Sequence, residues 1–174
     1  MNPNILPFRA QRGIVICLIA LSGLGAAQDL PTGWRRPTPA ETSGEWRQKS
    51  PTKFLKVKGD FDGDGKPDTA EILINPSSGK FALFARPSST GKWQLVAETE
   101  DVKSIDNVGI DLVNPGEYKT ACGKGYGDYA CAHGEPESLK VSTSAIDIFH
   151  TESSDSIVYW DATTKAFREV LISD

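Results

Sequence analysis

Four aspartates in one short segment carry the clearest chemical signal in the sequence. Segment 59–68 reads GDFDGDGKPD, which places carboxylates at Asp60, Asp62, Asp64 and Asp68. Carboxylates crowded on a tight turn repel one another, and a divalent cation with about six to eight oxygen ligands removes that repulsion. All-oxygen ligation is typical of Ca²⁺ rather than of zinc or copper. We therefore predict a calcium site in this loop; the alternative is a solvated acidic turn.

Further oxygens can come from the same stretch of chain. Counted from Asp60, the backbone carbonyl of Lys66 occupies the seventh position and Glu71 the twelfth. This spacing formally matches the helix–loop–helix pattern for calcium, and Gly65 permits the sharp turn that the pattern requires. We therefore predict Lys66 as a carbonyl ligand and Glu71 as an additional candidate ligand.

The residues on either side of the loop favour strands over helices. Residues 53–58 and 69–74 alternate between polar and apolar side chains with period two, as half-buried strands do. Pro67 falls at the eighth position, where paired helical loops bond through a backbone N–H that proline lacks. The sequence holds no second loop of this kind. We therefore expect a strand–loop–strand calcium site.

Segment 59–72, GDFDGDGKPDTAEI, resembles the FG-GAP/VCBS-type repeat loop of integrin-like β-propellers and related exported bacterial proteins. The resemblance implies calcium bound between two strands by Asp60, Asp62, Asp64 and Asp68 with the carbonyl of Lys66. Propellers repeat such a loop in about four to eight blades, whereas this chain has a single copy. We therefore expect a small β domain that stands alone.

A second candidate site lies between Cys122 and Cys131, which bracket a segment rich in glycine and tyrosine. The third cysteine, Cys17, lies in a predicted signal peptide at residues 1–27. The two that remain in the exported chain predict a disulfide, and a cysteine metal pair would need closer spacing and a second pair. Tyrosines on a closed, exposed loop are good recognition groups; the alternative is a long hairpin that needs a clasp. The candidate recognition residues are Lys124, Tyr126, Asp128 and Tyr129.

Signals for catalysis are weak. A bridged Cys131 offers no thiolate to the nearby His133, and His150 shares a strand face with isoleucines, as a core or edge histidine does. The G-x-S-x-G elbow of serine hydrolases is absent from the sequence. Nothing in the spacing selects an acid–base pair among the surface carboxylates Glu135, Glu137, Glu152 and Asp155. We therefore predict no catalytic residue and a protein that is not an enzyme.

The first 27 residues have the parts of a secretory signal peptide: Arg9 and Arg12, an apolar run over 13–24, and small residues at 25–27. We expect a periplasmic or secreted protein with no transmembrane span after signal cleavage. Residues 28–51 form a polar, proline-rich arm, and we expect Trp34 and Trp46 to pack partly on the domain, since exposed tryptophans leave a large apolar surface in water.

Residues 52–174 are predicted to form a single all-β domain, a meander, sandwich or small barrel of about eight or nine short antiparallel strands. Apolar residues alternate through nine segments, among them Ala70, Ile72 and Ile74, and Trp93, Leu95 and Ala97, and the breaks are rich in Asn, Pro, Ser and Gly. Residues 98–106 are the best place for a short helix.

Composition and motifs together favour a binding module. A formal net charge of −4 argues against a protein that neutralises nucleic-acid phosphates. We expect a monomeric, exported, non-catalytic calcium-binding β domain that recognises a protein or an envelope polymer. One alternative is an inhibitor or immunity protein that blocks a cell-wall hydrolase, with Tyr126 and Tyr129 of the disulfide loop inserted into the enzyme. A third is a calcium-dependent hydrolase.

Overall fold

The structure is a computed structural model that describes residues 30–47, 50–98, 102–125, 130–132, 135–151 and 153–173, and the fold is all-β, as predicted. The predicted signal peptide lies outside these residues. The strands of the first sheet are β1 (Lys56–Gly59), β2 (Asp68–Asn75), β3 (Lys80–Arg86) and β4 (Gln94–Glu98), in that spatial order. Those of the second, in the order β10-β9-β8-β5, are β5 (Val108–Val113), β8 (Ala145–His150), β9 (Asp155–Asp161) and β10 (Ala166–Ser173).

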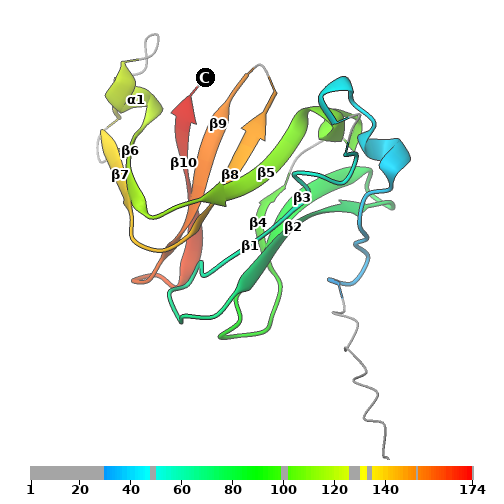
Figure 1. Ribbon diagram of the computed structural model, residues 1–174, viewed down its shortest axis with the longest axis horizontal. Coiled ribbons are helices and arrows are strands. Elements are labelled where there is room, and N and C mark those ends of the chain that lie inside the picture. The colour runs from blue at the N-terminus through cyan, green and yellow to red at the C-terminus, as the bar shows by residue number, and fades with distance from the viewer. Residues whose placement is uncertain are drawn as a thin grey trace, which may run out of the picture.

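All strand pairs are antiparallel, and the described part of the chain forms no closed barrel. A two-stranded ribbon of β6 (Gly116–Lys119) and β7 (Ser138–Val141) adds a third, smaller sheet. Strand β6 was not among the nine predicted segments, because its sequence GEYK has a single apolar residue to show a period. In Figure 1 the second sheet lies between the β6–β7 ribbon, on the left, and the first sheet, on the right.

Helices are few and short. The described residues form three 3₁₀ helices, η1 (Pro39–Thr42), η2 (Glu45–Arg47) and η3 (Val102–Asn107), and one α-helical turn, α1 (Ala121–Lys124). Helix η3 overlaps the acidic segment where a short helix was expected. Among the described residues, no helix is long and apolar enough to cross a membrane.

The main core lies between the two four-stranded sheets. It consists of alternating apolar side chains from both, including Ile72, Phe81 and Leu83 from the first sheet and Ile110 and Ile146 from the second, all at most 1% exposed. A smaller apolar cluster on the other face of the second sheet lies under the β6–β7 ribbon and includes Val113, Leu139 and Ile157. Burying these side chains supplies the main driving force for folding.

The N-terminal arm covers the outer face of the first sheet. The backbones of Arg35 and Ile74 exchange two hydrogen bonds, with N···O distances of 2.9 and 2.8 Å. Trp34 packs edge-on against Phe84 with ring centroids 4.8 Å apart, and Leu73 is fully buried in the same cluster. Strand β2 is therefore buried on both faces, although its sequence alternates as a half-buried strand does.

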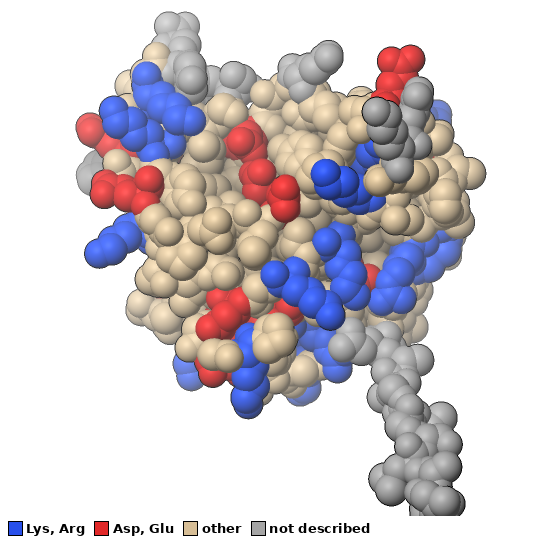
Figure 2. Space-filling view, in the orientation of Figure 1, with Lys and Arg blue, Asp and Glu red and all other residues tan. Residues whose placement is uncertain are grey.

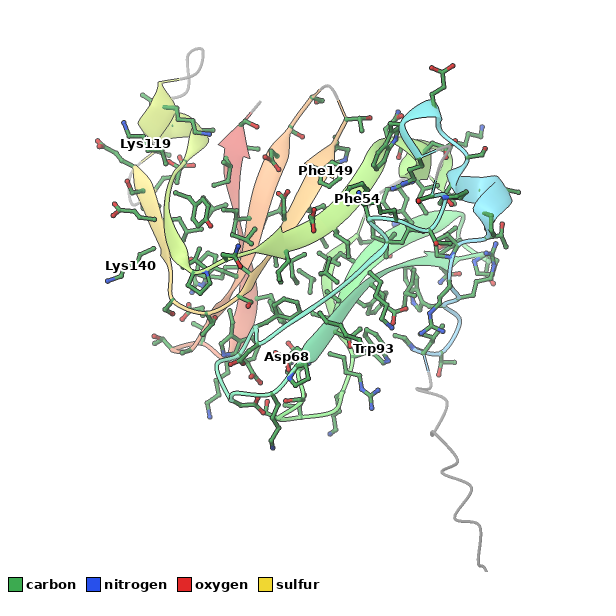
Figure 3. All side chains as sticks on the ribbon, in the orientation of Figure 1. Phe54, Asp68, Trp93, Lys119, Lys140 and Phe149 are labelled. Carbon is green, nitrogen blue, oxygen red and sulfur yellow. A yellow bond between two sulfur atoms is a disulfide. The ribbon has the colours of Figure 1, made fainter. Side chains whose placement is uncertain are left out.

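The second tryptophan of the arm anchors its other end. Trp46 packs against Phe54 and Phe149, with ring centroids 5.6 and 5.7 Å apart, and Figure 3 shows these two phenylalanines side by side. The neighbouring Arg47 is 2% exposed, and its guanidinium donates hydrogen bonds to the carbonyls of Ile105 and Val108. Burial lowers the pKa of Arg47 to about 10, yet the residue stays protonated at neutral pH.

Edge strand β4 departs from its predicted alternation. Leu95 was expected to share a buried face with Trp93 and Ala97, but Leu95 is 54% exposed. The β3–β4 pairing shifts register between Leu83 and Phe84, and Val96 packs against the core together with Ala97. A register shift in an edge strand rotates its side chains, and the sequence pattern of β4 alone does not show it.

Candidate metal centre

The acidic loop joins two paired strands, as predicted. Strand β1 ends at Gly59, β2 begins at Asp68, and these two residues face each other in the antiparallel register. Gly63 and Gly65 have positive φ angles of 79° and 80°, a conformation that other residues adopt only with strain. Gly65 thus permits the turn that its place in the sequence predicted, and the helix–loop–helix alternative does not apply.

Phe61 fixes the loop to the core. Its side chain is fully buried between the sheets, although the residues on either side of it are acidic. Its N–H donates to Asp68 Oδ2 at 2.7 Å, and its carbonyl accepts a hydrogen bond from Thr143 Oγ1 at 2.9 Å. Because Phe61 points into the core, its two neighbours Asp60 and Asp62 direct their side chains away from the core.

Three of the four predicted aspartates converge. One carboxylate oxygen from each of Asp60, Asp62 and Asp68 lies within 4.8 Å of the other two. Two oxygens on one Ca²⁺, at about 2.3–2.6 Å from the ion, lie at most about 5 Å apart. The donor set is all oxygen, and one member, Asp68, is 1% exposed. This group could hold a metal ion, and Figure 3 shows Asp68 at the loop end of the first sheet.

Backbone N–H groups already hold these carboxylates in place. Asp60 accepts from the N–H of Gly63 at 2.9 Å and of Gly65 at 3.0 Å. Asp68 Oδ2 accepts from Phe61 and also from Asp62, the latter at 3.2 Å. An ionised carboxylate has about four lone-pair sites, so these bonds leave acceptor capacity for a cation.

Asp64, the fourth predicted aspartate, is not part of the converging group. Its Oδ2 accepts a hydrogen bond from Ser88 Oγ at 2.7 Å, and its Oδ1 accepts from the N–H of Lys66 at 2.8 Å. The Ser88 hydroxyl is the main reason why the pKa of Asp64 lies below its ordinary value. Asp64 is therefore bonded to the turn between β3 and β4, which is distant from the acidic loop in the sequence.

The same turn contacts two more of the aspartates. The N–H of Ser88 donates to Asp68 Oδ1 at 2.6 Å, and Ser89 Oγ donates to Asp62 Oδ2. Ser88 and Ser89 belong to one of the breaks between predicted strands that are rich in Asn, Pro, Ser and Gly. No sequence signal links them to the loop, because the contact depends on the pairing of β2 with β3.

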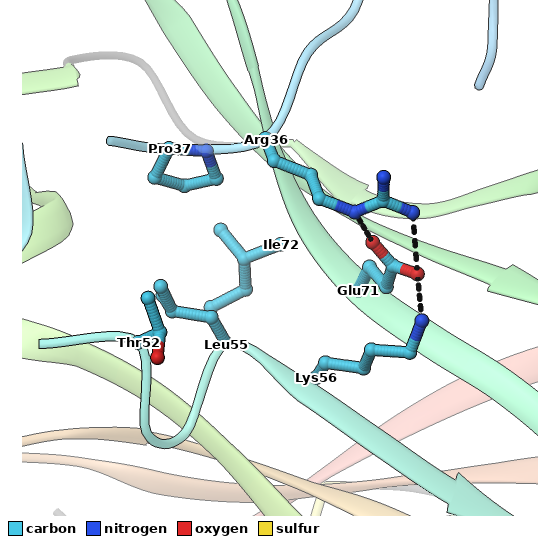
Figure 4. Close-up of a pocket in the computed structure, with 7 residues that line it drawn as sticks. All are labelled: Arg36, Pro37, Thr52, Leu55, Lys56, Glu71 and Ile72. Atoms are coloured by element: carbon cyan, nitrogen blue, oxygen red, sulfur yellow. Dashed lines mark hydrogen bonds and ion pairs between the residues drawn. The ribbon is translucent and has the colours of Figure 1, made fainter. Parts of the chain in front are cut away.

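Glu71 is bonded to two cations away from the loop. Its carboxylate accepts from Arg36 at 2.7 and 3.1 Å and from Lys56 at 2.6 Å, while its side chain is 2% exposed. Burial alone would raise the pKa of Glu71, but the bonds from Arg36 and Lys56 outweigh it and hold the pKa below its ordinary value. Figure 4 shows this triad at a pocket of about 260 Å³, whose other lining residues include Leu55 and Ile72. The structure does not bring Glu71 to Asp60, Asp62 and Asp68.

The disulfide prediction is confirmed. Cys122 and Cys131 are bonded, with Cα atoms 4.8 Å apart. Of the candidate recognition residues, only Lys124 is described; it is exposed, and its ammonium donates to the carbonyl of Ile172 at 2.9 Å. Tyr126, Asp128 and Tyr129 lie outside the described residues.

A second acidic group was not predicted. Asp111 and Asp147 face each other across the β5–β8 pair, and Asp155 of β9 lies within hydrogen-bonding reach of Asp147. Figure 2 shows a row of acidic side chains in the middle of the visible face, where Figure 1 has these strands. Burial, followed by the interactions with Asp155 and Asp111, raises the pKa of Asp147 to about 8. Asp155 Oδ1 is buried and has no hydrogen-bond partner among the described residues.

Comparisons with known proteins do not assign this chain to a family. No protein-family model matches the chain, and neither the curated proteins nor the solved structures contain a match. The candidate site therefore rests on the geometry of the loop and on the chemistry of its side chains.

Proposed function

We propose that this chain is an exported, non-catalytic calcium-binding β domain that recognises a protein or an envelope polymer. The observation that carries the proposal is the convergence of Asp60, Asp62 and Asp68 at the end of the β1–β2 pair. The ion would join the end of the first sheet to the loop that Phe61 anchors in the core.

The donor set supports calcium over other ions. Three carboxylates supply hard, charged oxygens, whereas zinc and copper sites use nitrogen or sulfur ligands. Mg²⁺ requires a near-ideal octahedral shell and keeps several waters, while an irregular loop on one strand pair suits the more flexible coordination of Ca²⁺. The backbone carbonyl of Lys66, predicted from the spacing of the loop, would supply a further oxygen.

Export is supported by the Cys122–Cys131 bond, because disulfides persist mainly in oxidising compartments. A recognition role is supported by the position of the loop at one end of the sheets, since β domains commonly bind partners through clustered loops. The partner can be captured from an envelope extract by the full chain, in calcium and in EGTA.

The calcium proposal is tested by thermal unfolding of the full chain in CaCl₂, MgCl₂ and EGTA. At tenfold excess over the dissociation constant, a bound ion adds about 1.4 kcal/mol to the free energy of unfolding. At about 2–4 °C per kcal/mol for a chain of this size, the melting temperature should rise by about 3–6 °C in calcium.

Two double variants with the same change in charge separate site binding from general charge repulsion. Asp60→Asn with Asp62→Asn should abolish the calcium shift. Glu117→Gln with Glu169→Gln, at two exposed positions outside the loop, should leave it intact. No shift in the unmodified protein, or the same shift in both variants, contradicts the proposal.

A further inference from the structure

An open groove of about 510 Å³ adjoins the acidic loop. Three turns contribute to it: the acidic loop, the β3–β4 turn and the β9–β10 turn. The lining residues are 62–64, Ser89, Thr90, Gln94, Trp160, Ala162 and Lys165. The turns come from both four-stranded sheets, and Figure 1 shows them together at the lower end of the molecule. We call this depression the loop groove.

Trp160 supplies a fixed aromatic wall. Its side chain is half-buried, next to the turn that joins β9 to β10. In the antiparallel register Trp160 lies directly opposite Phe167. The two rings pack edge to face, with centroids 5.1 Å apart and planes at 69°. Phe167 in turn packs against the main core. The indole is therefore held in place from one side while the other side lines the groove.

Hydrogen-bonding groups surround this aromatic surface. Asp62 and Asp64 provide carboxylates, Thr90 a hydroxyl and Gln94 a carboxamide. Both aspartates are also bonded to the serines of the β3–β4 turn, which fixes their place in the wall. A planar aromatic group beside several donors and acceptors matches a sugar ring, which has an apolar C–H face and hydroxyls that both donate and accept.

The charge and openness of the groove narrow the class of ligand. Among the described residues that line the groove, the two carboxylates of Asp62 and Asp64 outnumber the single cation, Lys165, so phosphates and acidic polymers are repelled. A small apolar ligand binds best in an enclosed, mostly apolar cavity, whereas this groove is open. An open groove also leaves room for an extended chain to continue beyond it.

We propose that the loop groove binds an uncharged saccharide chain, with one ring against Trp160 and its hydroxyls bonded to Asp62, Asp64 and Gln94. Because Asp62 also belongs to the converging aspartates, an ion held there would stand in the groove wall and accept sugar hydroxyls as ligands. That calcium dependence rests on the function proposed above; the contact with Trp160 does not.

Binding is measured by isothermal titration of the full chain with the neutral hexasaccharides cellohexaose, maltohexaose, mannohexaose and chitohexaose, in calcium and in EGTA. Hexagalacturonate serves as the acidic counterpart. We expect saturable binding to at least one neutral probe and none to the acidic one. Trp160→Ala should weaken binding about tenfold or more, by analogy with stacked nucleic-acid bases.

Two further variants keep the test sound. Ala162→Trp fills the groove from an exposed turn position without removing a core contact, and it should abolish binding even if Trp160→Ala fails to fold. Trp93→Phe alters another half-buried tryptophan, which packs on the far face of the first sheet, and it should leave binding unchanged.

Absence of binding to every neutral probe by the folded protein overturns the proposal, as does binding that Ala162→Trp leaves intact. Capture of an envelope protein that Ala162→Trp abolishes, with no glycan bound, assigns the groove to a protein partner instead. Glycan binding that persists in EGTA supports the saccharide site without the ion. A calcium shift in melting temperature without glycan binding leaves the calcium proposal standing and removes this one.

Discussion

Replacing Asp147 by asparagine should make the protein more stable at neutral and higher pH. Asp147 has Asp111 opposite it and Asp155 within hydrogen-bonding reach, and its pKa is raised to about 8. A neutral Asp147 can donate its proton to the carboxyl group of Asp155, which includes a buried oxygen without a described partner. Asparagine keeps the shape and a donor but carries no charge.

The sign and size of the effect follow from proton linkage. The folded pKa of Asp147 lies above the unfolded value, so its stabilising effect is fully present below about pH 4 and is lost as the pH rises through about 8. One proton taken up on folding gives a slope of about 1.4 kcal/mol per pH unit, or up to about 2.7 kcal/mol between pH 5 and 7. Because Asp147 is partly exposed to water, we expect about half of that.

Urea unfolding of both proteins between pH 5 and 8 measures this difference directly. The free energy of unfolding of Asp147→Asn minus that of the unmodified protein should increase with pH. Asp111→Asn removes one neighbouring charge only, and it should give a smaller increase of the same sign. Curves for Asp147→Asn and the unmodified protein that stay parallel over this range would refute the reasoning.

Three further substitutions test other parts of the structure. Glu71→Gln should lower stability by about 1–3 kcal/mol, since it weakens charged hydrogen bonds to a buried group, while the melting shift in calcium stays intact; loss of that shift would make Glu71 a ligand after all. Arg47→Leu should lower the free energy of unfolding in urea by about 3 kcal/mol or more, because two buried carbonyls lose their donors. An unchanged free energy of unfolding would mean that water replaces the guanidinium as the donor. Cys122→Ser with Cys131→Ser should lower stability by about 2–3 kcal/mol in the chain-entropy model, and an unchanged urea midpoint would count against that model here.

Local patterns predicted most of the fold. Alternation in segments such as 70–74 reflects a strand whose two faces differ in polarity. Of the ten strands in the described part of the chain, nine lie where such segments were found. The pattern could not show that β2 is buried on both faces, because the covering residues, Trp34 and Leu30, belong to the arm. It also missed the outward turn of Leu95, which a register shift between neighbouring strands produces.

The candidate site was predictable only where it is local. Period-two alternation on both sides of the loop indicated a strand–loop–strand turn, and spacing within the loop indicated the role of Gly65; both depend on a few adjacent residues. The separation of Asp64 from the converging aspartates depends on Ser88, a residue of the next turn. The loop groove and the pair of Asp111 with Asp147 depend on which strands lie side by side, and the sequence of a single strand does not carry that information.

The hydrogen bonds of the loop bear on what calcium would do for this domain. Phe61 is buried in the core, and Asp60 and Asp68 each accept two or more backbone N–H groups. Because these contacts are made between groups of the protein, we expect the fold itself to order the loop, unlike small metal domains that are unfolded when metal-free. Calcium binding should then tighten one end of the molecule rather than fold the chain, so the protein in EGTA should keep its β-sheet circular dichroism while its melting temperature falls.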